Sequence, residues 1–144
     1  MALPPFRADG WLPSGHHAAT WEDVFVRFGG TQENRRALLT ERLRQLRDDL
    51  RACGVTGTLL LDGSYISAKT EPGDFDLLLI APANIQVQKD ANPSLADLLD
   101  AEASERRGYS LFYIPENSPA REMLRGLWNV SKEGVEKGVV EVQL

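Results

Sequence analysis

The chain has little cysteine and no long apolar segment, and each shortage excludes a class of protein. Its 144 residues include a single cysteine, Cys53, so no disulfide can form within the chain, which suits a reducing compartment. The N-terminus has no cationic stretch followed by an apolar core, so a secretory signal is not expected. The apolar runs are far too short to span a bilayer. We therefore expect a cytoplasmic protein with no membrane partner.

An excess of basic charge is also missing. The chain has 21 acidic residues against 16 lysines and arginines, a net charge of −5, whereas a protein that coats nucleic acid is usually basic. Its length and its apolar content of 42% suit one globular domain with its own core. The proline-, glycine- and histidine-rich start shows no periodicity. We therefore expect a single domain over residues 1–144, with residues 1–19 as an extended N-terminal arm.

Capping residues and apolar periodicity predict four main helices. Thr20 is expected to cap the first and Thr31 the second. In the second helix four leucines recur at spacings of four, three and four, which marks the face toward the core: Leu39, Leu43, Leu46 and Leu50. The predicted helices span residues 20–28, 31–52, 94–107 and 119–127.

Apolar runs between these helices predict strands at residues 57–62, 74–81, 109–114 and 137–144. A short helix is expected to begin at Ser64, and residues 82–93 are expected to form a loop. This order predicts an α+β fold, a mixed twisted sheet of about four strands with helices packed mainly on one face.

Two short patterns carry the candidate chemistry. Along a strand, side chains alternate between faces, so Asp74 and Asp76 point the same way and Phe75 points opposite. Two adjacent carboxylates repel each other unless a cation lies between them. Mg²⁺ or Mn²⁺ suits such oxygen ligands and often accompanies a phosphate. A structural interpretation remains open, in which Asp74 ends a Pro-Gly-Asp turn and Asp76 is a buried, hydrogen-bonded carboxylate.

The preceding turn offers groups that suit a phosphate. Gly63 lets the backbone approach closely, and Ser64 with the first amides of the helix behind it can donate hydrogen bonds. Lys69 either contacts a triphosphate or is a solvated loop lysine, and Lys132 and Lys137 have the same two interpretations with less support. Asp62 either contacts the ligand or accepts hydrogen bonds from turn amides.

Gly63-Ser64, nine intervening residues and Asp74-Phe75-Asp76-Leu77 resemble the signature of the polymerase-β-like nucleotidyltransferase superfamily. Within it the chain looks most like a small bacterial family similar to minimal nucleotidyltransferases, a likeness that extends from the Leu3–His17 segment to the Lys137–Val140 segment. The resemblance implies that Asp74 and Asp76 are catalytic metal ligands. It also implies that Gly63 and Ser64 bind the phosphates of a nucleoside triphosphate.

The superfamily also places a third carboxylate on a neighbouring strand, and here the chain departs from the pattern. Ser110 occupies the expected position, and Glu116 and Glu141 are the nearest possible substitutes. Serine neither binds a second Mg²⁺ comparably nor accepts the proton.

Two functions follow. One is Mg²⁺-dependent transfer of a nucleoside monophosphate to a protein, RNA or small-molecule acceptor, in a bacterial toxin–antitoxin or defence setting. The other is an inactive module of the same fold that binds a nucleotide or a partner protein.

Overall fold

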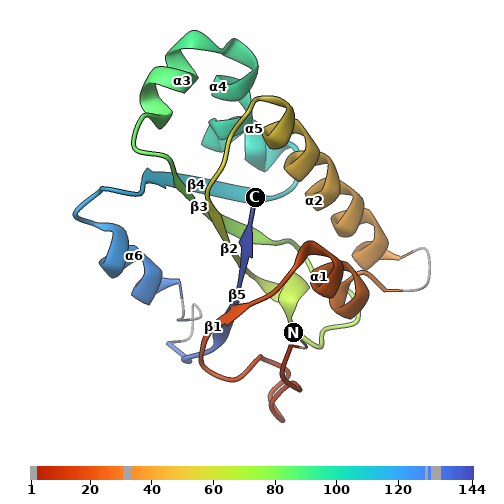
Figure 1. Cartoon of the computed structure of the whole chain (residues 1–144). Helices are drawn as coiled ribbons and strands as arrows, with labels where there is room; N and C mark the ends of the chain where they lie inside the picture. Colours follow the sequence, from red (N-terminus) through yellow and green to blue (C-terminus); the bar gives the residue numbers. More distant parts are fainter. Residues whose placement is uncertain (1–2, 31–33, 129, 131–133) are drawn as a thin grey trace.

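A computed structural model describes residues 3–30, 34–128, 130 and 134–144. The fold is α+β, built on one mixed five-stranded sheet of order β1-β5-β2-β3-β4 (Figure 1). β2 runs antiparallel to both of its neighbours, β3 and β5, while β3 pairs in parallel with β4 and β1 in parallel with β5. The strands are β1 (Gly15–Ala18), β2 (Thr58–Asp62), β3 (Asp76–Ala81), β4 (Ser110–Pro115) and β5 (Gly138–Gln143).

Six helices surround the sheet in the described part of the chain. They are α1 (Trp21–Phe28), α2 (Arg35–Ala52), α3 (Ile85–Ala91), α4 (Pro93–Leu99), α5 (Ala101–Arg106) and α6 (Arg121–Leu127). The predicted cap of α1 is confirmed, because the Thr20 hydroxyl accepts from the Asp23 amide at 3.0 Å and the Asp23 carboxylate accepts from the Thr20 amide. The predicted leucine stripe of α2 is also confirmed, since all four leucines are buried.

Several predicted boundaries differ from the structure because polar side chains cap unexpected positions. α2 begins at Arg35, where Asn34 Oδ1 accepts from the Ala37 amide at 3.2 Å, and Thr31 lies outside the described residues. The segment expected to be a loop, 82–93, contains α3. The helix expected over 94–107 is divided into α4 and α5, because Asp100 is extended and its carboxylate caps α5 through the Ala103 amide.

The N-terminal arm contributes a fifth strand to the sheet, where about four were expected. Residues 15–18 pair with β5, with His16 beside Val139 and Ala18 beside Glu141. Earlier in the arm, the Leu12 carbonyl accepts from the Gly138 amide at 3.0 Å. The partner lies more than a hundred residues away, so local periodicity contains no sign of this pairing.

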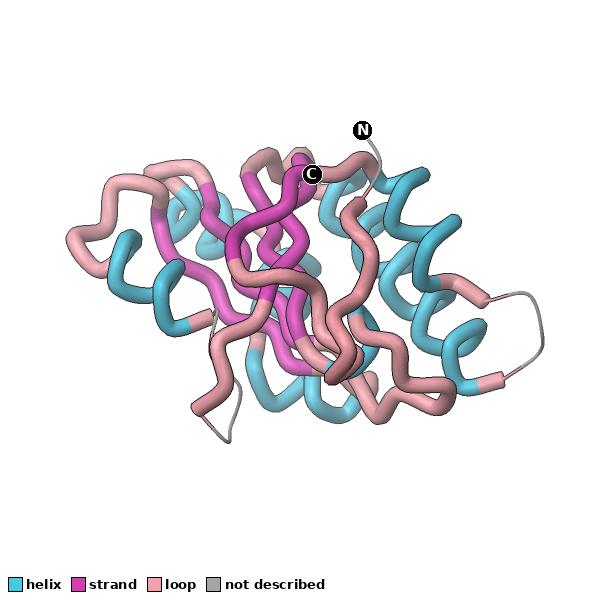
Figure 2. Tube along the Cα trace, turned by 90° about the horizontal axis from the view of Figure 1, so that it is seen from below, coloured by secondary structure: helices cyan, strands magenta, loops and turns pink. Residues whose placement is uncertain are grey.

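The two faces of the sheet are covered unequally. α1 to α4 pack on one face over buried residues of β2, β3, β4 and β5, and form the larger core cluster. The opposite face has a small cluster of Leu60, Leu78 and Ile80, against which Leu124 and Trp128 pack from α6 and its C-cap. Figure 2 shows α1 and α2 on one side of the strands and α6 on the other. Among the described residues, no helix is long and apolar enough to cross a membrane.

Candidate functional site

One cleft of about 510 Å³ is lined by the five residues predicted to bind the nucleotide and its metal ion, Gly63, Ser64, Lys69, Asp74 and Asp76. It lies where β2 ends and where β3 and β4 begin. A larger cleft, of about 680 Å³, lies between α2 and α4 and contains none of those five residues. The residues that line the smaller cleft include Trp11, Asp62, Gly63, Ser64, Lys69, Asp74, Asp76, Ser110 and Lys137.

Asp74 and Asp76 both face this cleft, although only Asp76 belongs to the strand. β3 begins at Asp76, two residues later than predicted, and Asp74 lies exposed just before it. Between them the Phe75 side chain is fully buried and stacks on Tyr109, with ring centroids 5.0 Å apart. The side chains therefore alternate as predicted, although Asp74 lies outside the strand: Phe75 is buried in the core, and the carboxylates on either side of it face the cleft.

Ser110 lies directly beside Asp76 on the neighbouring strand. The parallel ladder of β3 and β4 makes Asp76 and Ser110 Cα partners, and both residues line the cleft. The serine therefore takes the place where the resemblance leads one to expect the third acid. Its hydroxyl can donate or accept a hydrogen bond, but it carries no charge at neutral pH.

Neither acid considered as a substitute reaches this position. Glu116 follows the far end of β4, six residues beyond Ser110, which corresponds to roughly 20 Å along a strand. Glu141 lies on β5, two strands from β3, and its carboxylate pairs with Arg125 at 2.9 Å. Within the described ranges no group of three or more His, Cys, Asp or Glu side chains is placed to hold a metal ion.

The two halves of the motif are packed against each other. Gly63 has a φ of +92°, and a Cβ on it would lie 3.2 Å from both the Phe75 Cα and the Asp76 amide nitrogen. The Ser64 hydroxyl accepts from the Gly73 amide at 2.9 Å, and the Tyr65 amide donates to the Asp74 carbonyl at 3.2 Å. Gly63 is therefore required by the turn itself, whatever ligand approaches it.

The helix expected behind Ser64 is a single 3₁₀ turn, Ser64–Ile66, and its amides are largely occupied. The amides of Tyr65, Ile66 and Ser67 donate to the carbonyls of Asp74, Gly63 and Ser64. The expectation that several helix amides face a phosphate is therefore wrong. The Ser64 amide and the Ser64 hydroxyl proton have no acceptor among the contacts of the described residues and can donate to a ligand.

Arg36 of α2 organises the segment that follows this turn, a role that the sequence did not reveal. Its guanidinium donates to the Tyr65 carbonyl at 2.6 Å and to the carbonyls of Ser67 and Lys69, each at 2.5 Å. Burial lowers the pKa of Arg36 from its ordinary value, although an arginine side chain keeps its charge. The segment that ends at Lys69, an exposed residue on the edge of the cleft, thus has a fixed backbone.

A buried ion pair forms the inner wall of the cleft. The Lys137 ammonium donates to the Asp62 carboxylate, and the two residues are only 3% and 7% exposed. The ammonium also lies 4.5 Å from the centroid of the Trp11 ring. Asp62 thus accepts from a lysine rather than from turn amides. Lys137 is buried, in contrast to the solvated lysine that was one of its two interpretations. Lys132 lies outside the described residues. The sequence did not predict this pairing, because the two residues are 75 positions apart in the chain.

The chain belongs to the family of unknown function DUF6932, which it matches over residues 4–143. The match spans all five strands and every residue of the cleft. No curated protein and no solved structure matches the chain.

Proposed function

We propose that the cleft binds a nucleoside triphosphate with Mg²⁺ and that the protein transfers the nucleoside monophosphate to a hydroxyl acceptor on a protein, an RNA or a small molecule. The observation that carries this proposal is the convergence of Gly63, Ser64, Asp74 and Asp76 on one cleft. The order of an antiparallel β2–β3 pair followed by a parallel β4 supports a nucleotidyltransferase-like fold. The cytoplasm, where nucleotides and Mg²⁺ abound, is the setting we infer.

The donor set fits an Mg²⁺ ion that arrives with its nucleotide. Mg²⁺ keeps several waters and is usually held by one or two carboxylates together with substrate phosphates, so it does not need a cage of protein ligands. Asp74 and Asp76 would hold it, and Mn²⁺ accepts the same ligands. When bound, the ion neutralises phosphate charge and makes the α-phosphorus easier to attack.

The side chains and backbone of the chain position the reactants. The Ser64 amide and hydroxyl donate to phosphate oxygens, and Lys69 places a positive charge at the edge of the cleft. The acceptor oxygen forms a bond to the α-phosphorus, the bond from that phosphorus to the bridging oxygen breaks, and pyrophosphate leaves with the electron pair. The acceptor proton passes to solvent. Because Ser110 cannot take that proton as a carboxylate would, we expect slow turnover.

The second candidate function is an inactive module of the same fold that binds a nucleotide or a partner protein. Ser110 beside Asp76 is the observation that favours it. In either case the acceptor or partner is recognised by surfaces outside the cleft, for which the N-terminal arm and residues 82–93 are the candidates. A toxin–antitoxin or defence setting rests on the resemblance to minimal nucleotidyltransferases, an analogy of fold alone.

Labelled nucleotides test the proposal directly. Purified protein is incubated in bacterial lysate with Mg²⁺ or Mn²⁺ and each of the four nucleoside triphosphates, labelled at the α-phosphate. We expect label on a protein or RNA with the wild type and none with D74N/D76N, which keeps the side-chain shapes but removes both charges. E116Q, altered far from the cleft, is the matched control and should transfer like the wild type.

The remaining outcomes separate the two functions. Nucleotide binding without transfer would favour the inactive module. Neither binding nor transfer with any nucleotide would contradict the transferase and the nucleotide-binding module, and would leave only a module that binds a partner protein, with a structural role for Asp74 and Asp76.

A further inference from the structure

A second cleft, of about 430 Å³, adjoins the candidate site and has no part in the proposed function. This arm cleft lies between the N-terminal arm and the segment after the 3₁₀ turn, and is lined by residues 8–11, Ser64 and residues 67–69. We propose that the arm cleft receives the nucleoside of the bound nucleotide and that Trp11 packs against the base. The inference rests on the proposed function and adds the nucleoside site to it.

The two clefts meet at three shared residues. Trp11, Ser64 and Lys69 line both of them. In the proposed function Ser64 and Lys69 contact phosphate oxygens, so a phosphate lies at the boundary between the clefts. The rest of the ligand extends from that phosphate in two directions, toward the metal ion on one side and into the arm cleft on the other.

The charges decide which end of the nucleotide enters the arm cleft. Among the described residues that line it, the charged side chains are Asp9 and Lys69, and Lys69 lies at the boundary. The Asp9 carboxylate accepts from Arg7 Nη2 at 2.8 Å and remains partly exposed. Terminal phosphates would meet this carboxylate in the arm cleft, whereas in the other cleft they meet the metal ion. The uncharged nucleoside therefore suits the arm cleft better.

Trp11 offers a flat aromatic surface where the base would lie. Its side chain is half-buried and is the one aromatic group among the described residues that line the arm cleft. The Lys137 ammonium lies 4.5 Å from the centroid of the ring and helps to hold the indole in place. Every base has a flat face, so stacking on an aromatic side chain tolerates all four. We therefore expect Trp11 to favour a nucleoside without selecting one base.

Both walls of the arm cleft are held by hydrogen bonds before any ligand binds. The Arg7 amide donates to the Trp11 carbonyl at 2.7 Å, and the Gly10 amide donates to the Arg7 carbonyl at 2.9 Å, which closes the turn of the arm. The Ala68 amide donates to the Gly10 carbonyl at 2.9 Å and joins the two walls. Arg36 holds the carbonyls on either side of Ala68. A site fixed in this way loses little conformational freedom when a ligand binds.

Inorganic tripolyphosphate separates the two parts of the ligand, because it carries the phosphates without the nucleoside. Titration calorimetry of the full chain with Mg²⁺ measures its affinity for tripolyphosphate. The same titration is made with each of the four nucleoside triphosphate analogues that have a methylene group between the α- and β-phosphorus atoms. We expect the wild type to bind the analogues about tenfold or more tightly than tripolyphosphate.

Two variants remove the nucleoside site by different means. W11L deletes the aromatic surface, and A8F fills the arm cleft from an exposed position. Each should reduce the preference for the analogues about fivefold or more and leave the affinity for tripolyphosphate within about twofold. A52F is the matched control, because it makes the same substitution at an exposed alanine that lines the larger cleft between α2 and α4. It should leave both affinities unchanged.

The other results overturn the inference in distinguishable ways. Equal affinity of the wild type for the analogues and for tripolyphosphate would overturn it, and so would a preference that survives in A8F. If circular dichroism shows W11L to be unfolded, A8F decides alone. Analogue binding that persists in these cases leaves the proposed function intact. If the wild type binds neither the analogues nor tripolyphosphate, the proposed function fails, and this inference with it.

Discussion

Single residues in the cleft are constrained by close packing as well as by charge. Gly63 combines a positive φ with close contact to the backbone of the Phe75–Asp76 segment. Gly73, in the loop between the two halves of the motif, has open space around its Cα and no positive φ. The two glycines therefore make a matched pair in which one position needs glycine and the other does not.

G63A is expected to destabilise the protein by about 2 kcal/mol, because a φ of 92° with a ψ of 179° is a conformation nearly restricted to glycine that costs other residues roughly 1–3 kcal/mol, and because the new Cβ crowds its neighbours. G73A should change stability by less than about 0.5 kcal/mol, as surface substitutions usually do. Urea unfolding of both variants measures the difference. Equal effects at the two positions would contradict the packing described for Gly63.

At the scale of elements, α2 supports the site from behind. Arg36 lies in its first turn and donates to three carbonyls of the segment that runs from the 3₁₀ turn to Lys69, and to the Phe28 carbonyl at 3.1 Å. A helix in the core layer thus fixes the backbone of the segment that leads from the buried 3₁₀ turn to the edge of the cleft.

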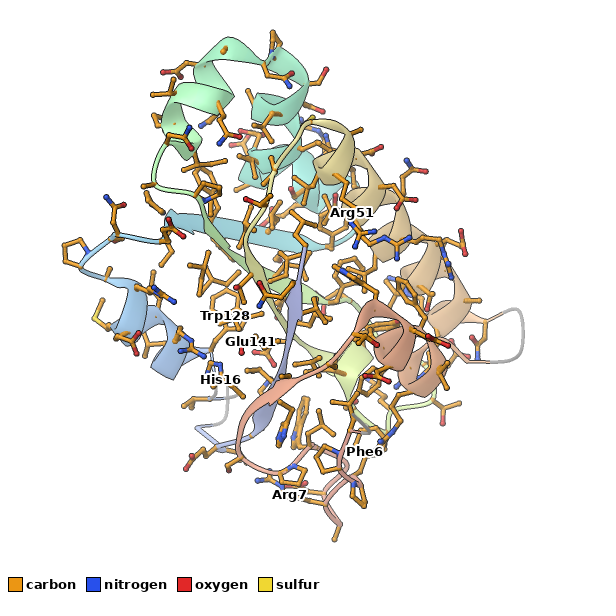
Figure 3. All side chains as sticks on the ribbon, in the orientation of Figure 1. Phe6, Arg7, His16, Arg51, Trp128 and Glu141 are labelled. Carbon is orange, nitrogen blue, oxygen red and sulfur yellow. The ribbon has the colours of Figure 1, made fainter. Side chains whose placement is uncertain are left out.

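R36K is expected to release this segment, because the single ammonium of lysine cannot reproduce a guanidinium that spans several acceptors. A hydrogen bond to a charged group contributes about 1.5–3 kcal/mol, so amide exchange at residues 67–69 should accelerate roughly tenfold or more. Hydrogen–deuterium exchange measures this rate. R51K, at the opposite end of the same helix (Figure 3), is the control and should leave these amides unchanged. Unaltered exchange in R36K would show that other contacts hold the segment.

How far the sequence predicted these elements depended on how local their causes were. The cap at Thr20, the α2 leucines and the three apolar strands β2, β3 and β4 were predictable, because each depends on neighbouring residues. β1 was not, because it exists only through pairing with β5. The break at Asp100 was missed because an aspartate suits a helix start as well as an exposed helix position.

The same distinction holds within the site. Gly63, Ser64, Asp74 and Asp76 lie close together in the chain, and their shared cleft was foreseeable. The pairing of Lys137 with Asp62 depends on the order of the strands. The role of Arg36 depends on backbone carbonyls, which every residue has, so the sequence does not indicate which of them accept hydrogen bonds from Arg36.

At the scale of the whole molecule, the thinly covered sheet face is closed by a polar contact. Arg125 of α6 pairs with Glu141 of β5, and its Nη2 lies 3.3 Å from His16 Nδ1 of β1. Figure 3 shows His16, Glu141 and Trp128 gathered between α6 and the strands. Burial, followed by the nearby Arg125 charge, lowers the pKa of His16 below its usual 6.5.

Acid is therefore expected to weaken this contact. The unfolded chain binds a proton at His16 near pH 6.5, whereas the folded chain binds it only at lower pH. The contribution of neutral His16 to the free energy of unfolding is therefore complete above about pH 6.5 and is lost as the pH falls toward the pKa of His16 in the folded chain. Urea unfolding between pH 7.5 and 5 should show a shallower decline for H16Q than for the wild type. Parallel curves would show that His16 does not contribute to the acid sensitivity.

The position of β5 also has a consequence for the order in which the sheet is completed during synthesis. β5 follows the other four described strands along the sequence, yet it lies between β1 and β2 in the interior of the sheet. While residues 138–143 are still inside the ribosome, β1 has no neighbour to pair with and one edge of β2 is open. Lys137 emerges in the same final stretch, so the nascent chain carries an unpaired Asp62 until translation of this segment is finished. The wall of the cleft is thus completed only after Lys137 and β5 have been synthesised, when β5 joins β1 to β2.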